Sequence, residues 1–416
     1  MKTYSILVAF LLSITFQFSF AQADDTQQLL DSAKNLFLKE RGLNADELDQ
    51  FNYEEIEVLL KKVIESEPQN PEAHYFLGYT YSRLNTRDGR SMINESLKYL
   101  YRSSEEFEKV ISITPEYNGQ MIVLDPYSKL SSEWGGMAMS YYHKNNIDSA
   151  KWAFQEGKKR GGFSEFILQL NKNVLDACSK NAILISSGDN FSIPLWYLQI
   201  VENYRTDVSV VDISLLNAQW YPRFLSEKGI VNFDLPKETL DTIEFIPWKD
   251  SLITINNFTW KLKPSYGNAY LLRGDRVFLS LLKQNEFRRE VFFTIAFNEE
   301  SRLSLSEYLS NRMIVEKLNT THEKELSPKQ YKQTLTQMLQ LGNLVNTNSK
   351  DEKSIYNTLR YVLLLKANDE LSKGRKKNTK ALIKILDNYG RESAIPYENE
   401  NWSKYAEYLK EQIKTF

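Results

Sequence analysis

Apolar and polar positions alternate differently along the chain, and the change predicts helical ends around a middle that contains strands. Ile56, Leu60 and Val63 recur at the spacing of one helical face in the N-terminal part. In the middle, Ala182 to Ser186 and Val208 to Ile213 are apolar runs of strand length, and they flank an amphipathic segment of helix length. A strand, a turn, a helix and a second strand in this order build a parallel sheet.

The rest of the chain extends this pattern. Further strands are predicted at Leu252 to Ile255, Phe258 to Leu262 and Glu290 to Phe297, with helices at Gln219 to Lys228 and Arg276 to Gln284. Beyond them the pattern predicts helices at Glu307 to Leu318, Tyr331 to Leu344, Ser354 to Leu371, Asn378 to Tyr389 and Asn401 to Ile413. We therefore expect a mixed α+β and α/β fold class. Helical hairpins occupy residues 24–170, a central α/β domain with a small parallel or mixed sheet occupies 171–320, and C-terminal helical hairpins occupy 321–416.

Segments of the N-terminal region resemble the tetratricopeptide repeat, in which helix pairs carry small and large apolar residues at fixed positions. The loop from Thr86 to Leu97 is longer than the repeat allows. Such hairpins must stack to bury their apolar faces. Two interpretations stay open: a concave surface that grips a peptide or a partner protein, and a brace that docks the next domain. The signature positions are Leu77, Gly78, Tyr81, Trp134, Ala138, Tyr141, Ala150 and Phe154.

The segment NAILISSGDNFSIPLWYLQIVENYRTDVSVVDISLLNAQWY begins at Asn181, and the segment FLSLLKQNEFRREVFFTIAFNEESRLSLSEYL ends at Leu309. Both resemble the soluble C-terminal region of a bacterial membrane-protein family related to protein O-mannosyltransferases. That family shows a strand, an Asn-Gly-Asp-Asn-Asp turn, then Pro-Leu-Trp-Tyr and Arg-x-Asp-Val. Its catalytic machinery belongs to a multi-span membrane part that this sequence lacks. The resemblance therefore implies an accessory ectodomain without glycosyl transfer, and Ser187 and Phe191 depart from the family's turn.

Polar residues follow the first two predicted strands of the middle domain. Ligands of open α/β sheets bind at the carboxyl ends of the strands, beside helix N-termini. Asp189 and Asn190 would lie at this edge, as would Asp212 or Asn217 from the neighbouring strand. The sequence therefore offers a candidate ligand site. The alternative is that Asp189 or Asn190 caps a helix that begins near Ser192, because side-chain oxygens satisfy free backbone N–H groups there.

Composition and motifs narrow the chemistry. The formal net charge is −2, which gives no reason to expect nucleic acid as a partner. The single cysteine, Cys178, lies among apolar helix positions and is interpreted as a small core residue. His74, His143 and His322 are far apart in the sequence, so no zinc ligand set is predicted. We expect no cofactor and no metal, and a binding function more than an enzymatic one.

The first residues predict export. Lys2 precedes the apolar run Ile6 to Phe20, and Ala21-Gln22-Ala23 forms a small-x-small cleavage site. The pattern is that of a secretory signal peptide over residues 1–23, cleaved after Ala23. No later apolar stretch approaches the roughly 20 residues that a membrane-spanning helix needs. A periplasmic or secreted protein with no membrane span after cleavage is expected.

Together these features predict an exported, non-enzymatic interaction or scaffold protein that binds a protein or glycoconjugate partner in the cell envelope. The alternative is a sugar- or nucleotide-sugar-binding accessory, or a weak hydrolase, that uses the polar cluster at the strand ends.

Overall fold

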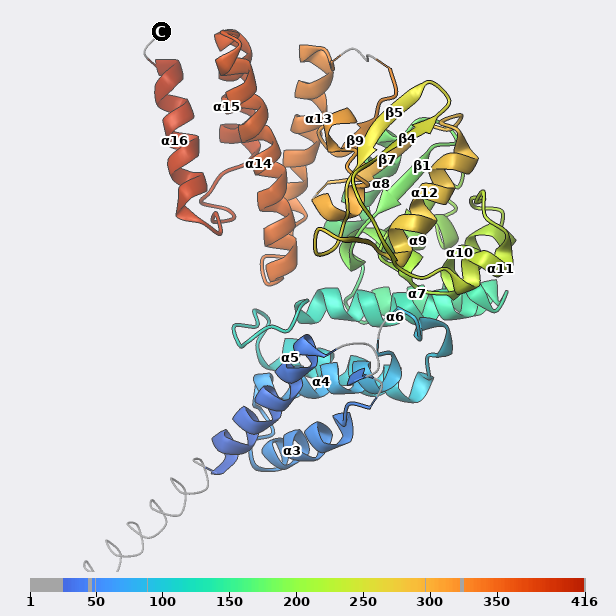
Figure 1. The fold of residues 1–416 in the computed structure, drawn as a ribbon. Coiled ribbons are helices and arrows are strands. Elements are labelled where there is room, and N and C mark those ends of the chain that lie inside the picture. Colours follow the sequence, from blue (N-terminus) through green and yellow to red (C-terminus); the bar gives the residue numbers. More distant parts are fainter. Residues whose placement is uncertain are drawn as a thin grey trace, which may run out of the picture.

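A computed structural model of the chain describes residues 25–43, 47–48, 50–87, 89–295, 297–321 and 325–414. The predicted signal peptide and His322 lie outside these residues. The described part is mostly helical and contains one small mixed sheet, which confirms the predicted fold class. Figure 1 shows α6 and α7 along one end of the sheet, the earlier helices beyond them, and α13 to α16 beside the sheet.

The N-terminal region is a stack of helices. Polar caps and prolines define where several of them begin. The Asn70 side chain accepts hydrogen bonds from the backbone N–H groups of the next helix's first turn, and Asp125 does the same for α6. The elements are a helix over residues 25–39, η1 (Glu40–Gly42), α3 (Tyr53–Ser66), α4 (Pro71–Asn85), η2 (Met92–Asn94), α5 (Leu97–Ile113), α6 (Pro126–His143) and α7 (Ile147–Lys159).

Small residues allow these helices to pack closely. A Cβ on Gly78 would lie 3.0 Å from the Phe107 ring, so α4 and α5 meet where the side chain is absent. The indole nitrogen of Trp134 donates a hydrogen bond to Ser104 Oγ at 2.9 Å, which links α6 to α5. Tyr141 is half-buried, and the other signature positions are buried. The residues chosen from the repeat pattern therefore serve packing between helices.

The central sheet has the strand order β2-β1-β7-β9-β8. β1 (Ile183–Ser186) pairs in parallel with β2 (Ser209–Asp212) and with β7 (Val291–Thr294). β9 (Val315–Leu318) runs antiparallel to β7 and to the edge strand β8 (Leu309–Asn311). The helix α9 (Asp189–Ile200) connects β1 to β2. The predicted strand–turn–helix–strand unit is thus present, and its two strands are neighbours.

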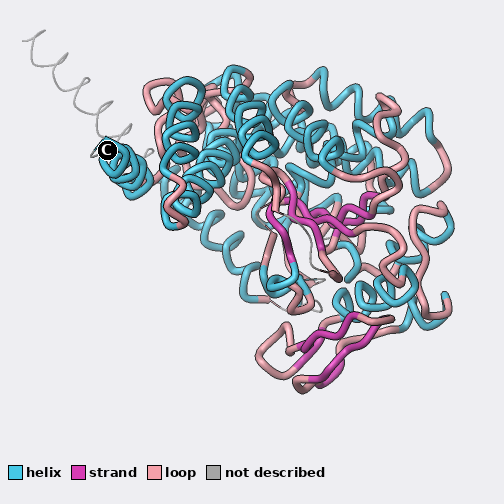
Figure 2. Tube along the Cα trace, turned by 90° about the horizontal axis from the view of Figure 1, so that it is seen from above, coloured by secondary structure: helices cyan, strands magenta, loops and turns pink. Residues whose placement is uncertain are grey.

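Further elements cover and extend the sheet, and Figure 2 shows strands in the middle of the molecule and at one edge, with helices around them. Two short antiparallel pairs lie outside the central sheet, β3 with β6 and β4 with β5. The elements are α8 (Glu165–Ala177), η3 (Leu215–Asn217), α10 (Trp220–Glu227), α11 (Lys237–Thr242), β3 (Ile246–Pro247), β4 (Ser251–Ile255), β5 (Phe258–Leu262), β6 (Tyr270–Leu271), α12 (Arg273–Asn285) and η4 (Glu299–Arg302).

The helix predicted at Glu307 to Leu318 is wrong. The segment forms η5 (Ser306–Tyr308) followed by the hairpin of β8 and β9. Met313 adopts a φ of 77° in the turn between the two strands, a conformation that ends any helix. Apolar residues spaced by three and four positions suggested a helix, but β7 offered an unpaired edge, and pairing with that edge decided the structure.

The C-terminal helices are α13 (Pro328–Gln340), η6 (Leu341–Asn343), α14 (Lys350–Ser372), α15 (Lys376–Tyr389) and α16 (Glu400–Lys414). The N-terminus of α14 meets that of α6. Asp125 Oδ2 accepts hydrogen bonds from the Ser349 hydroxyl at 2.5 Å and from the Asp351 N–H at 3.0 Å. The Asp125 N–H donates in return to Asp351 Oδ2 at 2.8 Å. This reciprocal cap joins the two helical regions across more than half of the chain.

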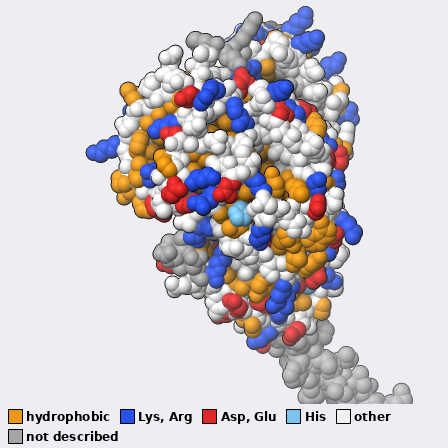
Figure 3. All heavy atoms as spheres, turned by 90° about the vertical axis from the view of Figure 1, so that its right-hand side faces the viewer, with side chains coloured by type: hydrophobic (Ala, Val, Ile, Leu, Met, Phe, Trp, Pro, Cys, Tyr) orange, Lys and Arg blue, Asp and Glu red, His pale blue; other side chains and the backbone are white. Residues whose placement is uncertain are grey.

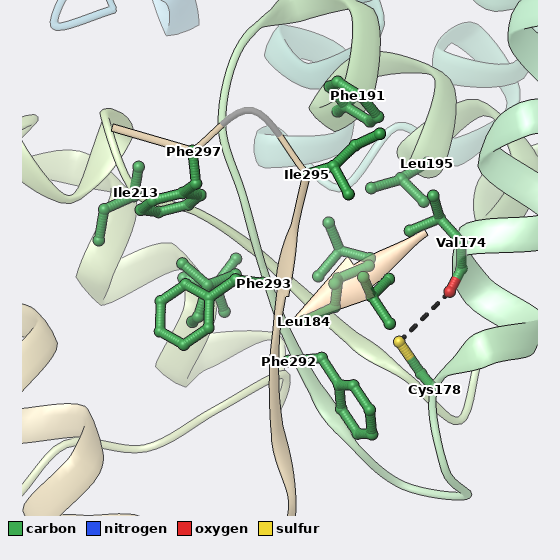
Figure 4. Packing of buried hydrophobic residues seen from close by; sticks show 14 of the residues in the cluster. Val174, Cys178, Leu184, Phe191, Leu195, Ile213, Phe292, Phe293, Ile295 and Phe297 are labelled. Carbon is green, nitrogen blue, oxygen red and sulfur yellow. Dashed lines mark hydrogen bonds between the residues drawn. The ribbon is translucent and has the colours of Figure 1, made fainter. Parts of the chain in front are cut away.

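The main apolar core lies around the central sheet. All residues of β1 and β7 are buried, so both faces of these strands are covered. Figure 4 shows residues of α8, α9 and the strands gathered in one cluster, with the Cys178 thiol pointing at the Val174 carbonyl oxygen 3.4 Å away. Burial raises the pKa of Cys178 to about 12. The thiol is therefore protonated and inert.

Across the described ranges of the chain, we find no helix with the length and apolarity that crossing a bilayer requires.

Candidate functional site

The helical hairpins and the α/β domain meet along α6 and α9. A Cβ on Gly135 of α6 would overlap Ile193 of α9, so the two helices approach at a position where only glycine fits. Between Ser128 and Ser140, only Ser132 of α6 is not buried. This face of the hairpins is therefore occupied by the chain's own α/β domain, as the brace interpretation requires.

A cavity of about 280 Å³, here called the junction pocket, opens at one end of this contact. It lies at the carboxyl ends of β1 and β2, where ligands of open α/β sheets bind. Three regions supply its walls: the end of α4 with the following loop, α6, and the start of α9 with the end of β2. Its polar lining residues are Ser82, Arg83, Thr86, Glu95, Lys129, Ser132, Glu133, Asp189, Ser192, Asp212 and Ser214.

Asp212 forms the floor of the pocket. Its carboxylate accepts hydrogen bonds from the Ser192 hydroxyl and from the Leu215 N–H, the latter at 2.9 Å. Ser192 Oγ lies 2.7 Å from Ser186 Oγ at the end of β1. Burial raises the pKa of Asp212 to about 6, although the Ser192 hydrogen bond opposes the rise. Asp212 is therefore held in place by a network that connects both strand ends.

Asp189 is the exposed acid at the rim. It is the first residue of α9, and Gly188 precedes it with a φ of 84°. Its Oδ2 accepts a hydrogen bond from the Ser132 hydroxyl of α6 at 2.6 Å, which bridges the two regions. The helix-cap interpretation of Asp189 and Asn190 is wrong, because Gly188 is the N-cap residue and no side chain caps α9. The positive φ explains the outcome, since glycine adopts it without a penalty.

Two buried polar atoms of the pocket, Thr86 Oγ1 and Glu95 Oε2, form no hydrogen bond of ordinary geometry with the described residues, and the Thr86 hydroxyl makes only a weak contact with the Glu95 carboxyl group. Burial raises the pKa of Glu95 well above its usual value, the nearby Glu133 adds to the rise, and Thr86 opposes it. The environment of Glu95 therefore favours its protonated form more than water does, and in that form the carboxyl group can donate a hydrogen bond. A Cβ on Gly136 would overlap the Glu95 carboxyl group, so this glycine makes room for it.

A buried ion pair completes the helical wall. Lys129 Nζ lies 2.5 Å from Glu133 Oε1, one turn along α6, and donates to Ser82 Oγ at 2.9 Å. The Ser82 hydroxyl in turn donates to Glu133 at 2.6 Å. Arg83, the other base of the lining, binds Glu40 through two guanidinium nitrogens. Both basic residues thus have acidic partners.

Two of the four predicted site residues do not line the pocket. The Asn190 carbonyl oxygen accepts a hydrogen bond from Asn171 at 3.1 Å. Asn217 Oδ1 accepts from the Gly274 N–H at 2.8 Å, at the start of α12. Asn217 therefore supports the fold where η3 meets α12, and the structure brings together only Asp189 and Asp212.

Sequence reasoning missed the half of the site that comes from the helical region. Glu95 lies in the loop whose excess length was noted, and Trp220 Nε1 binds the Gly89 carbonyl oxygen of that loop at 2.8 Å. The excess length of this loop was the feature of the sequence that could have indicated its role in the site. Lys129 and Glu133 carried a second signal, because charges four residues apart on an otherwise small and apolar helix indicate a buried pair.

The described residues contain no group of three or more His, Cys, Asp or Glu side chains arranged to hold a metal ion. His74 lies 2.5 Å from Glu106 in the helical region, and the His143 ring packs against Trp220 and Phe224. Neither histidine lines the junction pocket.

Figure 3 shows acidic and basic side chains interspersed on one face of the molecule, with apolar groups between them.

Comparison with protein families finds a match to TMEM260-associated domain 2 at residues 168–230. The match begins inside α8 and covers β1, α9, β2, η3 and α10, and these elements include Asp189 and Asp212. It is consistent with similarity to the soluble region of TMEM260-like proteins. A comparison with curated proteins found no match.

Proposed function

We propose that the chain is a non-enzymatic binding protein of the cell envelope that holds a neutral polyhydroxyl group, the glycan of a glycoconjugate, in the junction pocket. The observation that carries this proposal is a polar cavity at the carboxyl ends of two parallel strands that contains buried oxygens without partners.

Hydroxyl-rich ligands suit those oxygens. A buried polar atom without a partner costs roughly 1–3 kcal/mol, so a ligand that supplies the missing hydrogen bonds gains that amount. A sugar hydroxyl both donates and accepts, and it can therefore pair with the Glu95 carboxyl group and with the Thr86 hydroxyl at the same time. Serine hydroxyls and the exposed Asp189 carboxylate offer further partners at the rim.

The charges of the lining favour a neutral ligand. Lys129 and Arg83 are engaged by Glu133 and Glu40, so neither is available to a phosphate or a carboxylate. Asp189 and Asp212 would repel an anion. A nucleotide-sugar, the other ligand considered above, carries phosphates and fits this pocket less well than the neutral sugar.

The packing favours a rigid support over a peptide groove. The α6 face that a peptide would need is covered by α9, and Ser132 contacts Asp189 across the contact. We infer that the tetratricopeptide-like hairpins serve to form one wall of the pocket. Export through the predicted signal peptide would place this pocket where envelope glycans are found.

The experiment is a titration of the purified chain with neutral mono- and disaccharides, followed by calorimetry. Thr86→Val keeps the shape of the side chain and removes its hydroxyl, and we expect it to weaken binding about three- to tenfold. Asp189→Ala should weaken binding similarly. Asp148→Ala is the matched control, because Asp148 is also an exposed acid in the first turn of a helix but lies in α7, outside the pocket.

Absence of any heat or melting shift with the whole sugar panel would overturn the proposal. Equal weakening of sugar binding by Asp189→Ala and Asp148→Ala would show that the measured binding depends on acids at helix ends and not on the junction pocket.

A further inference from the structure

A second cavity of about 410 Å³, here called the lysine pocket, opens at the other end of the contact between α6 and α9. Its walls come from the end of α6, the start of α7, the end of α9, β2 and α10. Trp196 lines both this cavity and the junction pocket. The two cavities are therefore separated by the body of α9.

The charges that line the lysine pocket have one sign. Among the described residues that line it, Lys151 and Lys228 are the charged ones, and none is an aspartate or a glutamate. In the part of the chain that the structure describes, neither lysine forms an ion pair. Lys228 Nζ donates to Asn145 Oδ1 at 2.6 Å and lies 4.4 Å from the centre of the Tyr142 ring. Burial lowers the pKa of Lys228, as expected for a cation removed from water without an anionic partner.

The rest of the wall is apolar and partly exposed. Ile147 is 39% exposed, and Tyr142 and Ile200 are half-buried. Phe224 lies behind them, with Lys228 Nζ 5.9 Å from its ring centre. A cation above aromatic faces, beside an open apolar wall, can bind a negative group and a ring-shaped or aliphatic body together.

We propose that the lysine pocket binds a small organic anion, a carboxylate attached to an apolar or aromatic body. The carboxylate pairs with Lys228, with Lys151 nearby at the rim, and the apolar body covers Ile147 and Tyr142. Charge complementarity selects this class of ligand, because the lining holds two uncompensated positive charges. This site is separate from the glycan site proposed above and does not depend on it.

The test uses phenylacetate as the probe, phenylacetamide as its neutral analogue, and inorganic phosphate as an anion without an apolar body. Binding to the purified full chain is followed by calorimetry and by displacement of 8-anilinonaphthalene-1-sulfonate fluorescence. We expect phenylacetate to bind at least about tenfold more tightly than phenylacetamide, because the amide oxygen still accepts a hydrogen bond from Lys228 but carries no negative charge to pair with it.

Lys228→Met keeps the apolar stem and removes the charge, and we expect it to weaken phenylacetate about tenfold or more, with partial recovery in Lys228→Arg. Lys180→Met is the matched control, since Lys180 is exposed and lies outside the pocket. Lys151→Met, at an exposed position, should weaken binding a few-fold without any risk to folding.

Equal affinity for phenylacetate and phenylacetamide would overturn the proposal, as would unchanged binding in both Lys228→Met and Lys151→Met. If phosphate displaces the dye as well as phenylacetate does, the proposal that the ligand carries an apolar body is overturned. Loss of sugar binding in the junction-pocket variants, with phenylacetate binding retained, would confirm that the two sites are independent.

Discussion

The junction pocket and the lysine pocket lie at opposite ends of the same helix pair, yet they have opposite charge. The junction pocket has four acids and two bases in its lining, and both bases are paired. The lysine pocket has two lysines and no acid among the described residues that line it. The helices α6 and α9 serve both, and Trp196 faces both. The charge of each cavity is therefore decided mainly by the residues that segments other than α6 and α9 contribute at that end.

At one end, the over-long loop after α4 brings Glu95, and the carboxyl end of β2 brings Asp212. At the other end, α7 brings Lys151, and the end of α10 is followed by Lys228. A pair of packed helices thus acts as a common support, and neighbouring segments give each end its own ligand preference. This difference can be tested by variants that affect one pocket, or both, in a predictable way.

The largest effect is expected from comparing the buried Lys129 of the junction pocket with the half-buried Lys228 of the lysine pocket. Lys129→Met leaves the buried Glu133 without its partner, and we expect a loss of about 3–5 kcal/mol in the free energy of unfolding. Lys228→Met removes a cation that has no acidic partner, and we expect a change of less than about 1 kcal/mol. Chemical denaturation measures both. The double variant Lys129→Met/Glu133→Leu should recover much of the loss, and equal losses in the two single variants would contradict the stated difference in pairing.

The next effect concerns the support that both pockets share. Gly135→Val places a branched side chain against Ile193, and overpacking of this kind costs about 1–3 kcal/mol. Because α6 and α9 bound both cavities, ligand binding at both should weaken together. Gly42→Val is the control, since no atom of the described residues lies within 4 Å of a Cβ at Gly42. If Gly135→Val disturbs only one pocket, the helix pair is not a common support.

The third prediction concerns how the free energy of unfolding changes with pH because of Asp212 in the junction pocket. The pKa of Asp212 is about 6 in the folded protein against 3.8 ordinarily, so the folded state binds this proton more tightly than the unfolded state does. The free energy of unfolding therefore rises as the pH falls from about 7 towards 4, by at most about 3 kcal/mol from this group. Asp212→Asn should reduce this slope, measured by urea denaturation at several pH values.

Part of the slope should remain in Asp212→Asn. Burial also raises the pKa of Glu352 to about 7 and the pKa of Asp351 above its usual value, and both lie where α14 meets α6. These groups act with the same sign. An unchanged slope in Asp212→Asn would show that the other buried carboxyl groups, Glu95 of the junction pocket and Glu352 and Asp351 of the joint between α6 and α14, account for the pH dependence.

The smallest effect concerns the hydrogen bond between Ser132 and Asp189. Asp189→Ala and Asp148→Ala each remove an acid from the first turn of a helix, which costs about 0.3–1 kcal/mol. Asp189→Ala also removes the Ser132 hydrogen bond, so it should cost about 0.5 kcal/mol more. Thermal unfolding without ligand measures the difference. Identical melting temperatures would mean that this exposed contact adds nothing to the docking of α9 on α6.

The spacing of apolar residues along the sequence was enough to predict the strands that are buried on both faces and the C-terminal helices. β1 and β7 are buried on both faces, and their continuous apolar runs read directly as strands. The C-terminal helices were predicted close to their observed bounds. The hairpin of β8 and β9 was missed because its apolar spacing fits a helix as well as a strand, and only the free edge of β7 distinguishes the two.

The residues of the candidate site also divide into those that the sequence predicted and those that only the tertiary structure placed there. Asp189 and Asp212 follow strands, and a general rule about strand ends was enough to select them. Asn217 was selected by the same rule, but η3 places it against Gly274. Glu95, Lys129 and Glu133 could not be assigned to the site, because they precede the sheet by many residues and reach it only through helix packing.

The sequence alone determined the mixed architecture, the unit of β1, α9 and β2, and two of the acids at its edge, because strand and helix periodicity and turn chemistry are local properties. The tertiary structure alone decided that the face of the hairpins is covered, that a buried ion pair and the Glu95 carboxyl group join those two carboxylates, and that two lysines meet at the far end of the same helices. These features depend on which surfaces fit together, and that follows from packing between segments distant in the chain.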